Sequence, residues 1–549
     1  MKAMTPIHRI QGDGLRSPIA GDRVTTRGVV TGSVRKGFFL QDPDGGPDDC
    51  SHGVFVYARR DRPPHGALVV VEGVVLDFVA DADDRPTTQI HLRGLRIVRR
   101  KGPRIQPVWI DADVLDTDDA TLAAWLNRHE GMLVGVPADS TFVAPSNPYG
   151  DYVVLPPGLD VPRARNGGVL VDPQRPLRWY PSFRFLRYDR APRVDVGARL
   201  QEAIVGPLNY RAQSYQIAAN DPPKVQDAKA FRTVRTLAGA HDAMTILALN
   251  GFNLDPHVER PSRVKDPRLD VDDDVGDGRY DALAGAIVDD AGAPDVVALQ
   301  EMQDDDGAEI SAEVSAERNY ETITEAIARA GGPDYDWIDV EPTVDAEGGQ
   351  PGGNIRNAFL YRRDRVELDE GSVRRIGADE EAFVDSRKAL VARFALRSSG
   401  RSILLVNVHL ASKRHQLPLF APEDPGLDPR ESVRVEQART IREALDDVDG
   451  DVYVTGDFND HEFSRTLHVL CEGDLVNLVE TLEPDDRFDY NHRGTSQALM
   501  HGVVRGVQRD EGRAAYEILH GNESTGVQPG TKGQRPTDHA YVLARLTPR

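Results

Sequence analysis

The sequence predicts a protein of several domains, in which two β-rich units precede a larger α/β unit. Up to about residue 104, short runs rich in Val, Ile, Thr and Phe are separated by Gly, Pro and Asp, a pattern typical of strands and turns. From His241 onward, apolar β runs alternate with helical stretches, which indicates an α/β layered fold with buried strands. The length of 549 residues fits about three domains at ~100–200 residues each.

The first unit, residues 1–104, is predicted to be all-β. Five short strands with long connecting loops favour a small Greek-key barrel of the OB type, and any other small β-sandwich is the alternative. Phe38, Phe39 and Phe55 could stack bases there, although alternation along a strand sends some of them into the core. The predicted strands are Arg23–Val34, Gly37–Gln41, Val54–Ala58, Ala67–Val79 and Gln89–Val98.

The second unit, residues 105–240, is predicted to be a β-rich domain that ends in a linker. Thr121–His129 has the pattern of a short helix, and Met132–Val136 and Tyr152–Leu155 have the pattern of strands. Pro, Arg and Asn dominate Pro156–Arg193, which indicates irregular chain at the surface.

The third unit, residues 241–549, carries the α/β pattern. The acidic stretch Asp270–Asp277 between its elements is interpreted as a solvated loop. The predicted helices are Tyr280–Asp289, Ala308–Gly331 and Val433–Leu445. The predicted strands are Thr245–Leu249, Val296–Leu299, Ala358–Tyr361, Ile403–Val408, Val452–Thr455 and Tyr541–Leu546.

Bulk properties narrow the classes of function. The net charge of −22 argues against a protein that binds nucleic acid by bulk attraction, but it allows an enzyme whose carboxylates hold a cation. Two cysteines, Cys50 and Cys471, exclude a disulfide framework and a cysteine zinc site. The sequence contains no run of ~18 apolar residues, so no membrane span is predicted. The N-terminus lacks the apolar core of a signal peptide, so the expectation is a cytoplasmic protein, or a secreted one whose signal has been removed.

Polar side chains recur where the predicted strands of the third unit end. Asn250 follows one strand, Glu301 another, and His409 a third. Asp457 follows the strand Val452–Thr455, and Asp538 precedes the last strand. Strand ends at one sheet edge converge in space, so these residues are predicted to form one site.

The residue types fit phosphodiester hydrolysis with a hard cation such as Mg²⁺, which prefers carboxylate and amide oxygens. Asn250, Glu301 and Asp538 are the predicted metal ligands. Asp457 is the candidate base that activates a water, and Asn459 is its candidate partner. A hydrogen-bond donor must stabilise the charge that develops on the phosphoryl oxygens, and the candidates are His409, His539 and Arg356.

These segments resemble the endonuclease/exonuclease/phosphatase superfamily in order and spacing over about 300 residues. The matching segments are LALNGFNLDP around Asn250, DVVALQEMQDDDG (295–307), NIRNAFLYR (354–362), LLVNVHLASKR (404–414), VYVTGDFND (452–460) and RPTDHAYVL (535–543). TTRGVVTGSVRKGFFLQDPDG (25–45) and HEGMLVGVPADSTFV (129–143) are similar to the OB-like and second β-rich regions of bacterial extracellular nucleases.

The resemblance implies a four-layer sandwich, two packed β-sheets flanked by helices, with the site at one end. It also implies catalytic roles for Asp457, His539, His409 and Asn459. Arg356 and Tyr361 lie in the segment that touches the scissile phosphate in this family. Asn407 and Lys413 are expected to bind substrate, and Glu341 is a candidate to orient His409. The implied cofactor is Mg²⁺, with Mn²⁺ or Ca²⁺ as alternatives.

One segment departs from the family pattern. Relatives carry an aspartate in a segment resembling SQALDH, where its carboxylate orients the histidine of the Asp-His pair. Here the segment is SQALMHG (496–502), with Met500 at the expected position. A thioether cannot hold an imidazole in that way, so either His539 is poorly oriented or another acid replaces the aspartate.

Three functions are consistent with the sequence. The first is a metal-dependent nuclease that acts on DNA or RNA. The second is a phosphatase or phosphodiesterase for a smaller substrate, with the same catalytic residues. The third is a catalytically weakened nucleic-acid-binding protein, which only Met500 supports. A nuclease in the cytoplasm would endanger its host, which favours restraint by a regulatory protein partner.

Overall fold

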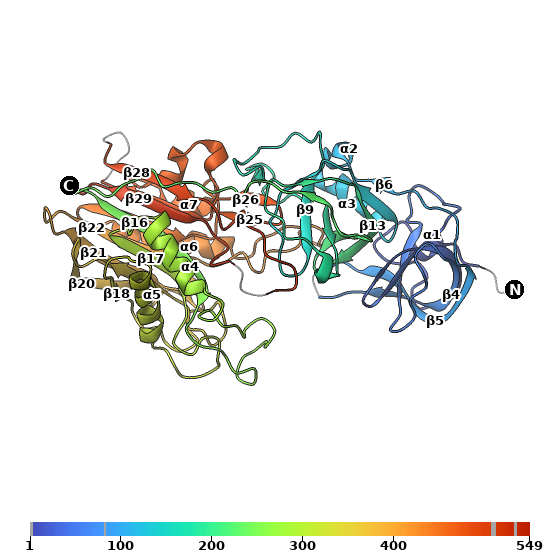
Figure 1. The fold of residues 1–549 in the computed structure, drawn as a ribbon, viewed down its shortest axis with the longest axis horizontal. Coiled ribbons are helices and arrows are strands. Elements are labelled where there is room, and N and C mark those ends of the chain that lie inside the picture. The colour runs from blue at the N-terminus through green and yellow to red at the C-terminus, as the bar shows by residue number, and fades with distance from the viewer. Residues whose placement is uncertain (1–3, 82–83, 507–511, 532–534) are drawn as a thin grey trace.

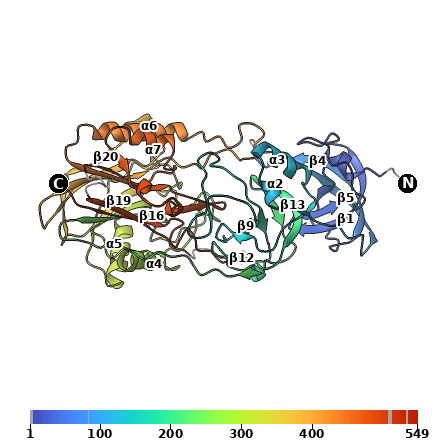
Figure 2. The same cartoon turned by 90° about the horizontal axis from the view of Figure 1, so that it is seen from above.

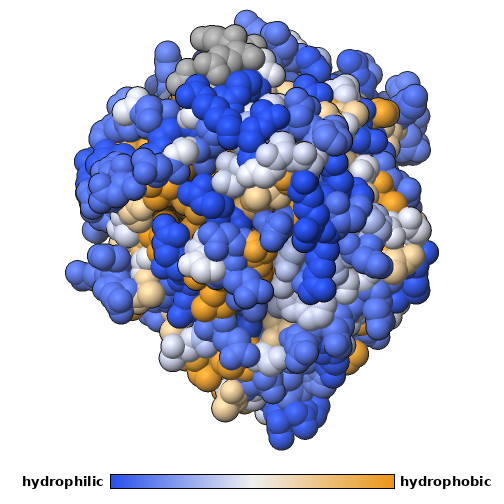
Figure 3. Space-filling model, turned by 90° about the vertical axis from the view of Figure 1, so that its left-hand side faces the viewer, coloured by the Kyte–Doolittle hydropathy of each residue, from blue (hydrophilic) through white to orange (hydrophobic). Residues whose placement is uncertain are grey.

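The molecule, described here from a computed structural model, consists of three parts arranged along its long axis (Figure 1). The structure describes residues 1–549 except 1–3, 82–83, 507–511 and 532–534. The N-terminal barrel lies at one end, a β-rich middle domain follows, and a two-sheet α/β domain forms the other end. None of the described helices is long and apolar enough to cross a membrane. The face at the C-terminal end is mainly hydrophilic, with apolar residues scattered over it (Figure 3).

The barrel is closed, and its strand order is β1-β2-β3-β5-β4. Its interior is filled by Val, Ile and Leu side chains together with Phe38, which is fully buried. Phe39 is also buried, so neither ring is available to stack bases, whereas Phe55 is half-buried. The elements are α1 (Ile7–Gln11), β1 (Arg23–Val34), β2 (Gly37–Gln41), β3 (Gly53–Tyr57), β4 (Leu68–Phe78) and β5 (Thr87–Arg99).

The middle domain is a nine-stranded sheet of short strands in the order β15-β12-β8-β9-β11-β14-β13-β7-β6, covered by two helices. Asp118 begins the longer helix, because its carboxylate accepts the N–H of Thr121 at 2.8 Å. The elements are β6 (Val108–Trp109), α2 (Ala112–Leu115), α3 (Asp119–Arg128), β7 (Leu133–Val136), β8 (Thr141–Phe142), β9 (Asp151–Leu155), β11 (Ser182–Arg184), β12 (Arg199–Leu200), β13 (Ile204–Arg211), β14 (Ser214–Ala218) and β15 (Val225–Gln226).

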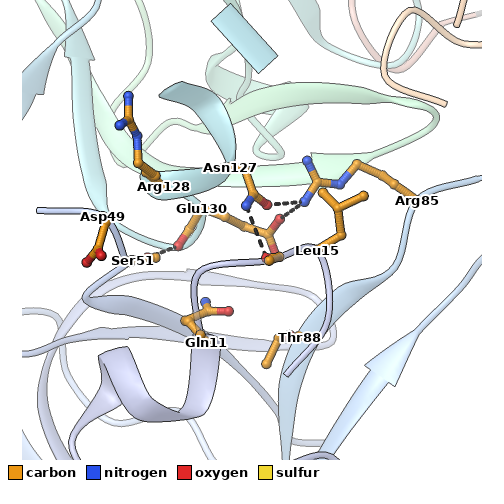
Figure 4. Close-up of a pocket in the computed structure, with 11 residues that line it drawn as sticks. Gln11, Leu15, Asp49, Ser51, Arg85, Thr88, Asn127, Arg128 and Glu130 are labelled. Atoms are coloured by element: carbon orange, nitrogen blue, oxygen red, sulfur yellow. Dashed lines mark hydrogen bonds and ion pairs between the residues drawn. The ribbon is translucent and has the colours of Figure 1, made fainter. Parts of the chain in front are cut away.

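Buried polar contacts join the barrel to the middle domain around a small cavity (Figure 4). Arg85 of the barrel pairs with Glu130 at 3.0 Å, and its guanidinium lies over the rings of Tyr210 and Tyr215. The hydroxyl of Tyr210 donates to Asp84 at 2.5 Å. Since charges are seldom buried without partners, these contacts fix the barrel in one orientation.

The third part has four layers, as the resemblance implies. Two six-stranded sheets face each other across a large apolar core. Helices α4 and α5 cover the first sheet, and α6 and α7 cover the second (Figure 2). The helices are α4 (Arg279–Gly285), which continues as a π-helical turn over Ala286–Asp290, α5 (Glu317–Arg329), α6 (Glu431–Leu445) and α7 (Arg465–Leu470).

The strand order places the predicted strands at the centre of both sheets. The first sheet is β18 (Asp336–Ile338), β19 (Arg356–Tyr361), β17 (Val296–Met302), β16 (Met244–Leu254), β29 (Tyr541–Leu546) and β28 (Ala514–Leu519). The second is β20 (Val366–Ile376), β21 (Ala389–Leu396), β22 (Ser402–His409), β23 (Asp451–Asp457), β27 (Met500–Arg505) and β24 (Val476–Asn477). A small third sheet, β10-β26-β25, joins β10 (Val169–Leu170) to β26 (Thr495–Gln497) and β25 (Tyr490–His492).

Two predictions for the third part were wrong. The helix predicted over Ala308–Gly331 begins only at Glu317, because the carboxylate of Asp305 accepts the N–H groups of Arg318 and Asn319 and fixes the first turn. The acidic stretch Asp270–Asp277 is not wholly solvated, because Asp274 is buried and forms an ion pair with Arg279.

Candidate active site

The predicted polar residues meet where the central strands of both sheets end. Strands β16 and β17 are parallel and carry Asn250 and Glu301. Strands β22 and β23 are also parallel, and His409 stands opposite Asp457 in their register. Because both pairs end at the same side of the domain, the four side chains face one another, as the sequence predicted.

The backbone is irregular at these strand ends. The register of β17 with β19 shifts between Leu299 and Met302, and Glu301 within this interval has φ +55°. Asn459 has φ +52°, also in the left-handed region that non-glycine residues rarely adopt. Such irregularities turn a side chain away from the strand's alternation, and here they bring Glu301 and the segment after Asp457 to the site.

Gly456 allows the two strands of the second sheet to approach each other. Its φ is +129°, and a Cβ at this position would lie 2.1 Å from the carbonyl oxygen of Val408. A side chain would therefore push β23 away from β22 and displace Asp457, which is the next residue.

The core of the site is a group of three possible metal ligands. Glu301, His409 and Asp457 each offer an atom within 4.8 Å of the others. Nε2 of His409 lies 3.6 Å from Oε1 of Glu301 and 3.6 Å from Oδ2 of Asp457. Two carboxylates beside an imidazole suit a divalent cation, and such an ion would offset the repulsion between them.

Asn250 contacts this group through its side-chain amide. Its Nδ2 donates to Glu301 at 3.3 Å and to Asp457 at 3.5 Å, while its Oδ1 accepts the N–H of Phe252 at 2.8 Å. Asn250 therefore contacts both carboxylates, and its amide oxygen, which accepts one hydrogen bond, keeps a second lone pair for the predicted metal.

The electrostatics of the group reflect burial and crowded charge. Burial, with the charges of Asp538 and Asp457, raises the pKa of Glu301 to about 7. Burial also raises the pKa of Asp457 to about 6. Burial and the nearby charges of Arg387 and His539 hold the pKa of His409 well below its usual range, which leaves its imidazole neutral. A site of this kind favours a bound cation over ionised carboxylates alone.

His539 faces the group from the first sheet and is held by a residue that the sequence did not point to. Its Nδ1 lies 2.7 Å from Oδ2 of Asp489, and its Nε2 lies 4.0 Å from Oδ2 of Asp457. Burial opposes the charge on the ring, yet Asp489, Asp538 and Asp457 raise the pKa of His539 to about 10. The ring of Tyr490 stacks on it at a centroid distance of 4.8 Å.

Asp489 resolves the question raised by Met500. Met500 is fully buried in the core between the sheets. The second carboxylate oxygen of Asp489 accepts the N–H of Leu499 at 2.6 Å and of Met500 at 3.0 Å. The orienting carboxylate thus comes from the chain beside Met500, and His539 is well oriented without an aspartate at position 500.

Asn459 and Asp538 lie at the site, as predicted. The backbone N–H of Asn459 donates to Asp457 at 2.8 Å, and its Nδ2 donates to the other carboxylate oxygen at 3.3 Å. Asp538 is half-buried, and its charge is the strongest of those that raise the pKa of Glu301. It stands beside the group of three ligands without belonging to it.

Arg356 and Tyr361, predicted together, are separated by the length of β19. Arg356 pairs in register with Met302 near Glu301, and it is buried against Asp339 at 3.2 Å. Its Nη2 has no partner within the described part of the chain. Tyr361 stands at the opposite end of the strand, where its hydroxyl donates to Asp336 at 2.8 Å. The prediction for Tyr361 was wrong, since the strand carries it away from the site.

Asn407 and Glu341 do not take the predicted positions, whereas the prediction that Lys413 binds substrate stays a prediction. Asn407 is fully buried and joins the two sheets, because its Nδ2 donates to the carbonyls of Leu299 and Ala358. Lys413 pairs with Asp460 at 3.0 Å. Glu341 is exposed, and Nδ1 of His409 has no partner among the described residues.

Arg387 is a further residue that the sequence analysis missed. It lies just before β21, a strand that was not predicted, and it is buried. Its Nη2 donates to the carbonyl of Leu410 at 2.8 Å, which also accepts from Asn459. No described residue bonds to its buried Nε. Burial lowers the pKa of Arg387, and the charges of Glu301 and Asp457 oppose this lowering, so a cation stands beside the carboxylates.

A buried histidine supports the chain behind Asp489. His520 lies 3.3 Å from Asp486 and 3.4 Å from Glu523, and its ring stacks on Phe488 at 4.0 Å. Burial alone would lower the pKa of His520, but the two carboxylates raise it to about 9. The charged ring thus ties the segment before Asp489 to the loop after β28.

We expect the stabilisation by His520 to disappear in alkaline solution. Because the folded pKa is about 9 and the ordinary value is 6.5, its contribution is complete below pH 6.5 and is lost as the pH rises through 9. The contribution is on the order of 3 kcal/mol. Thermal melting of His520→Gln should therefore show a large deficit at pH 6 that narrows by pH 9.5. The same deficit at both pH values, or none for His520→Gln beyond that of exposed His468→Gln, would contradict the assignment.

Comparison with known families identifies two regions of the chain. The model of the Endonuclease/Exonuclease/phosphatase family matches residues 222–541. A model for a domain of unknown function (DUF8508) matches residues 98–227, which include the middle domain. A search of curated proteins finds no match.

Several solved structures match somewhat more than half of this chain. D. rerio TDP2 humanized by 14 mutations has 15% identity, covers 55% of this chain and 98% of its own, and gives a TM-score of 0.36. The endonuclease/exonuclease/phosphatase from Bacteroides vulgatus has 15% identity, 56% and 99% coverage, and a TM-score of 0.35. The human nocturnin catalytic domain has 14% identity, 58% and 98% coverage, and a TM-score of 0.36. Because the family model spans more than half of the chain and ends just beyond His539, the protein belongs to the endonuclease/exonuclease/phosphatase family.

Proposed function

We propose that the protein is a divalent-metal-dependent phosphodiesterase that cleaves nucleic acid, DNA in the first place. The observation that carries the proposal is the position of His539, whose Nδ1 lies 2.7 Å from Asp489 and whose Nε2 faces Asp457 beside Glu301. A cationic donor opposite paired carboxylates suits a phosphate bound between them. The family and the names of its solved members, such as a TDP2 complexed with a single-strand DNA product, support this class of reaction.

Each side chain has a task that its geometry supports. A divalent cation held by Glu301 and Asp457 would polarise the phosphate and make a bound water more acidic. Asp457 accepts a proton from the attacking water, and the two hydrogen bonds from Asn459 keep its carboxylate aligned. His539 donates to a phosphoryl oxygen or to the leaving oxygen, because Asp489 holds its Nδ1 and leaves Nε2 toward the site. Arg387 and Arg356 add positive charge, and each has a donor nitrogen to which none of the described residues bonds.

The barrel supports nucleic acid as the substrate. We propose that this closed five-stranded barrel is of the OB type, which binds oligonucleotides on one face. On that barrel, the half-buried ring of Tyr57 stacks with His91 at a centroid distance of 4.8 Å. Aromatic rings of this kind offer surfaces on which bases stack without sequence preference.

The test uses two substrates and two variants. Purified protein is incubated with supercoiled plasmid and, separately, with bis(4-nitrophenyl) phosphate, in Mg²⁺, in Mn²⁺ and in EDTA. We expect metal-dependent cleavage of both, which Asp457→Ala lowers about 10²-fold or more. The control is Asp364→Ala, which removes an exposed carboxylate just beyond the end of β19 that lies away from the site. Hydrolysis of the small diester without nicking would favour the second function, and no hydrolysis in any metal would refute the proposal.

A further inference from the structure

The hairpin beside His539 is attached to the middle domain. Strand β26 lies outside the two six-stranded sheets of the described chain and pairs in parallel with β10 of the middle domain. Next to this pairing, the N–H of Val171 donates to the carbonyl of Ser496 at 2.9 Å. Nδ2 of Asn491 donates to the carbonyl of Val143 at 2.8 Å. The hairpin is thus bonded to the middle domain along both of its strands.

This hairpin carries two residues that touch His539. Asp489 stands at its start and holds Nδ1 of His539, while the carbonyl of Asp489 accepts the N–H of Ala540 at 2.7 Å. Tyr490, the first residue of β25, stacks on the imidazole. A hairpin of two three-residue strands is marginal on its own, so its position depends on what it pairs with.

Two further segments of the catalytic domain are anchored in the same way. Asn522 donates to the carbonyl of His539 at 3.1 Å, and the neighbouring Ser524 accepts from Asn166 of the middle domain at 2.9 Å. The loop that follows His409 inserts Phe420 into the core of the middle domain. There its ring meets Trp179 and Tyr215 edge to face, at centroid distances of 6.4 and 5.1 Å.

We propose that the middle domain is part of the active-site scaffold, in that it holds hairpin β25–β26 in the place where Asp489 orients His539. The inference rests on the proposed function only for its expected effect on kcat. Catalytic side chains must be held within about 0.5 Å of their working geometry, and a displacement of 1 Å can lower the rate about 10²-fold. The domain of unknown function thus positions the residues of the site and contributes no reacting side chain of its own.

The experiment uses the full chain and substitutes residues on the contact. Asn491→Asp keeps the oxygen that caps the hairpin turn at Gly494, but places an acceptor against the carbonyl of Val143. Asn166→Ala removes the bond to Ser524 without adding charge. The matched control is Tyr210→Phe, which removes a buried hydrogen bond at the other end of the same domain. We expect Asn491→Asp and Asn166→Ala to lower kcat on bis(4-nitrophenyl) phosphate about 10-fold or more, with KM within about 2-fold, and Tyr210→Phe to leave both unchanged.

A second measurement separates this inference from the proposed function. Amide hydrogen exchange over residues 488–500, in the absence of substrate, should become faster in Asn491→Asp and stay unchanged in Tyr210→Phe. If the wild-type protein hydrolyses no phosphodiester, the proposed function fails and the exchange result still decides whether the middle domain holds the hairpin. Unchanged exchange in Asn491→Asp, or full kcat in spite of faster exchange, would overturn the inference.

Discussion

Replacement of Asp489 by asparagine is expected to lower kcat by about 10³–10⁴-fold while KM changes little. The same exchange of an orienting aspartate costs about 10⁴ in the serine proteases, where the histidine is left in the wrong tautomer. Here the carboxylate accepts from Nδ1 of His539 at 2.7 Å, is fully buried and helps to raise the pKa of that ring. An asparagine can still accept the N–H groups of Leu499 and Met500, so the backbone is retained while the charge is lost.

The measurement is steady-state hydrolysis of bis(4-nitrophenyl) phosphate in saturating metal, with thermal melting in parallel. Asp364→Asn, which alters an exposed carboxylate, provides the control and should keep wild-type kcat. A kcat for Asp489→Asn within about 3-fold of wild type would show that His539 does not need its carboxylate partner, and it would remove His539 from the proposed mechanism.

Introduction of an aspartate at Met500 is expected to destabilise the protein and to leave kcat no higher. Met500 is fully buried, and its N–H already bonds to Asp489, while Asp457 stands opposite it in the register of β23 and β27. A new carboxyl group there would be unpaired between two acids, and an uncompensated buried charge costs about 3–5 kcal/mol. Because burial favours the protonated acid, the loss of stability should grow as the pH rises above about 4.

Thermal melts of Met500→Asp at pH 5 and pH 8 measure this effect, with Met500→Leu as the volume-conserving control. A gain in kcat for Met500→Asp in the wild-type background would instead mean that Asp489 orients His539 incompletely.

Much of the site could be predicted because its residues follow buried strands. Buried parallel strands are nearly continuous apolar runs, so a polar residue at the end of one stands out, as Asn250, Glu301 and Asp457 do. The prediction for Tyr361 rested on the resemblance of its segment to the family, and that resemblance does not tell which end of an antiparallel strand lies at the site. The prediction that Asn407 binds substrate failed because an amide within a strand can join two sheets as readily as it binds a ligand.

Asp489 could not be predicted from the pattern of its own segment. It precedes a three-residue strand without an apolar run, and it lies 50 residues from His539. Its position depends on the pairing of β26 with β10, whose residues are more than 300 positions earlier in the chain. Local periodicity carries no information about a contact of this range, and an expectation taken from relatives pointed to position 500 instead.

The left-handed backbone at Glu301 sets thermal stability against activity among variants at this position. A bulky residue with φ +55° is held in a conformation that glycine would adopt freely, at a cost of about 1 kcal/mol or more. Selection for thermal stability alone would therefore favour glycine at position 301, whereas any requirement for the carboxylate opposes it. A mutational library sorted once for folding and once for hydrolysis should rank residue 301 in opposite order, so this single position would report how far stability and chemistry conflict in the protein.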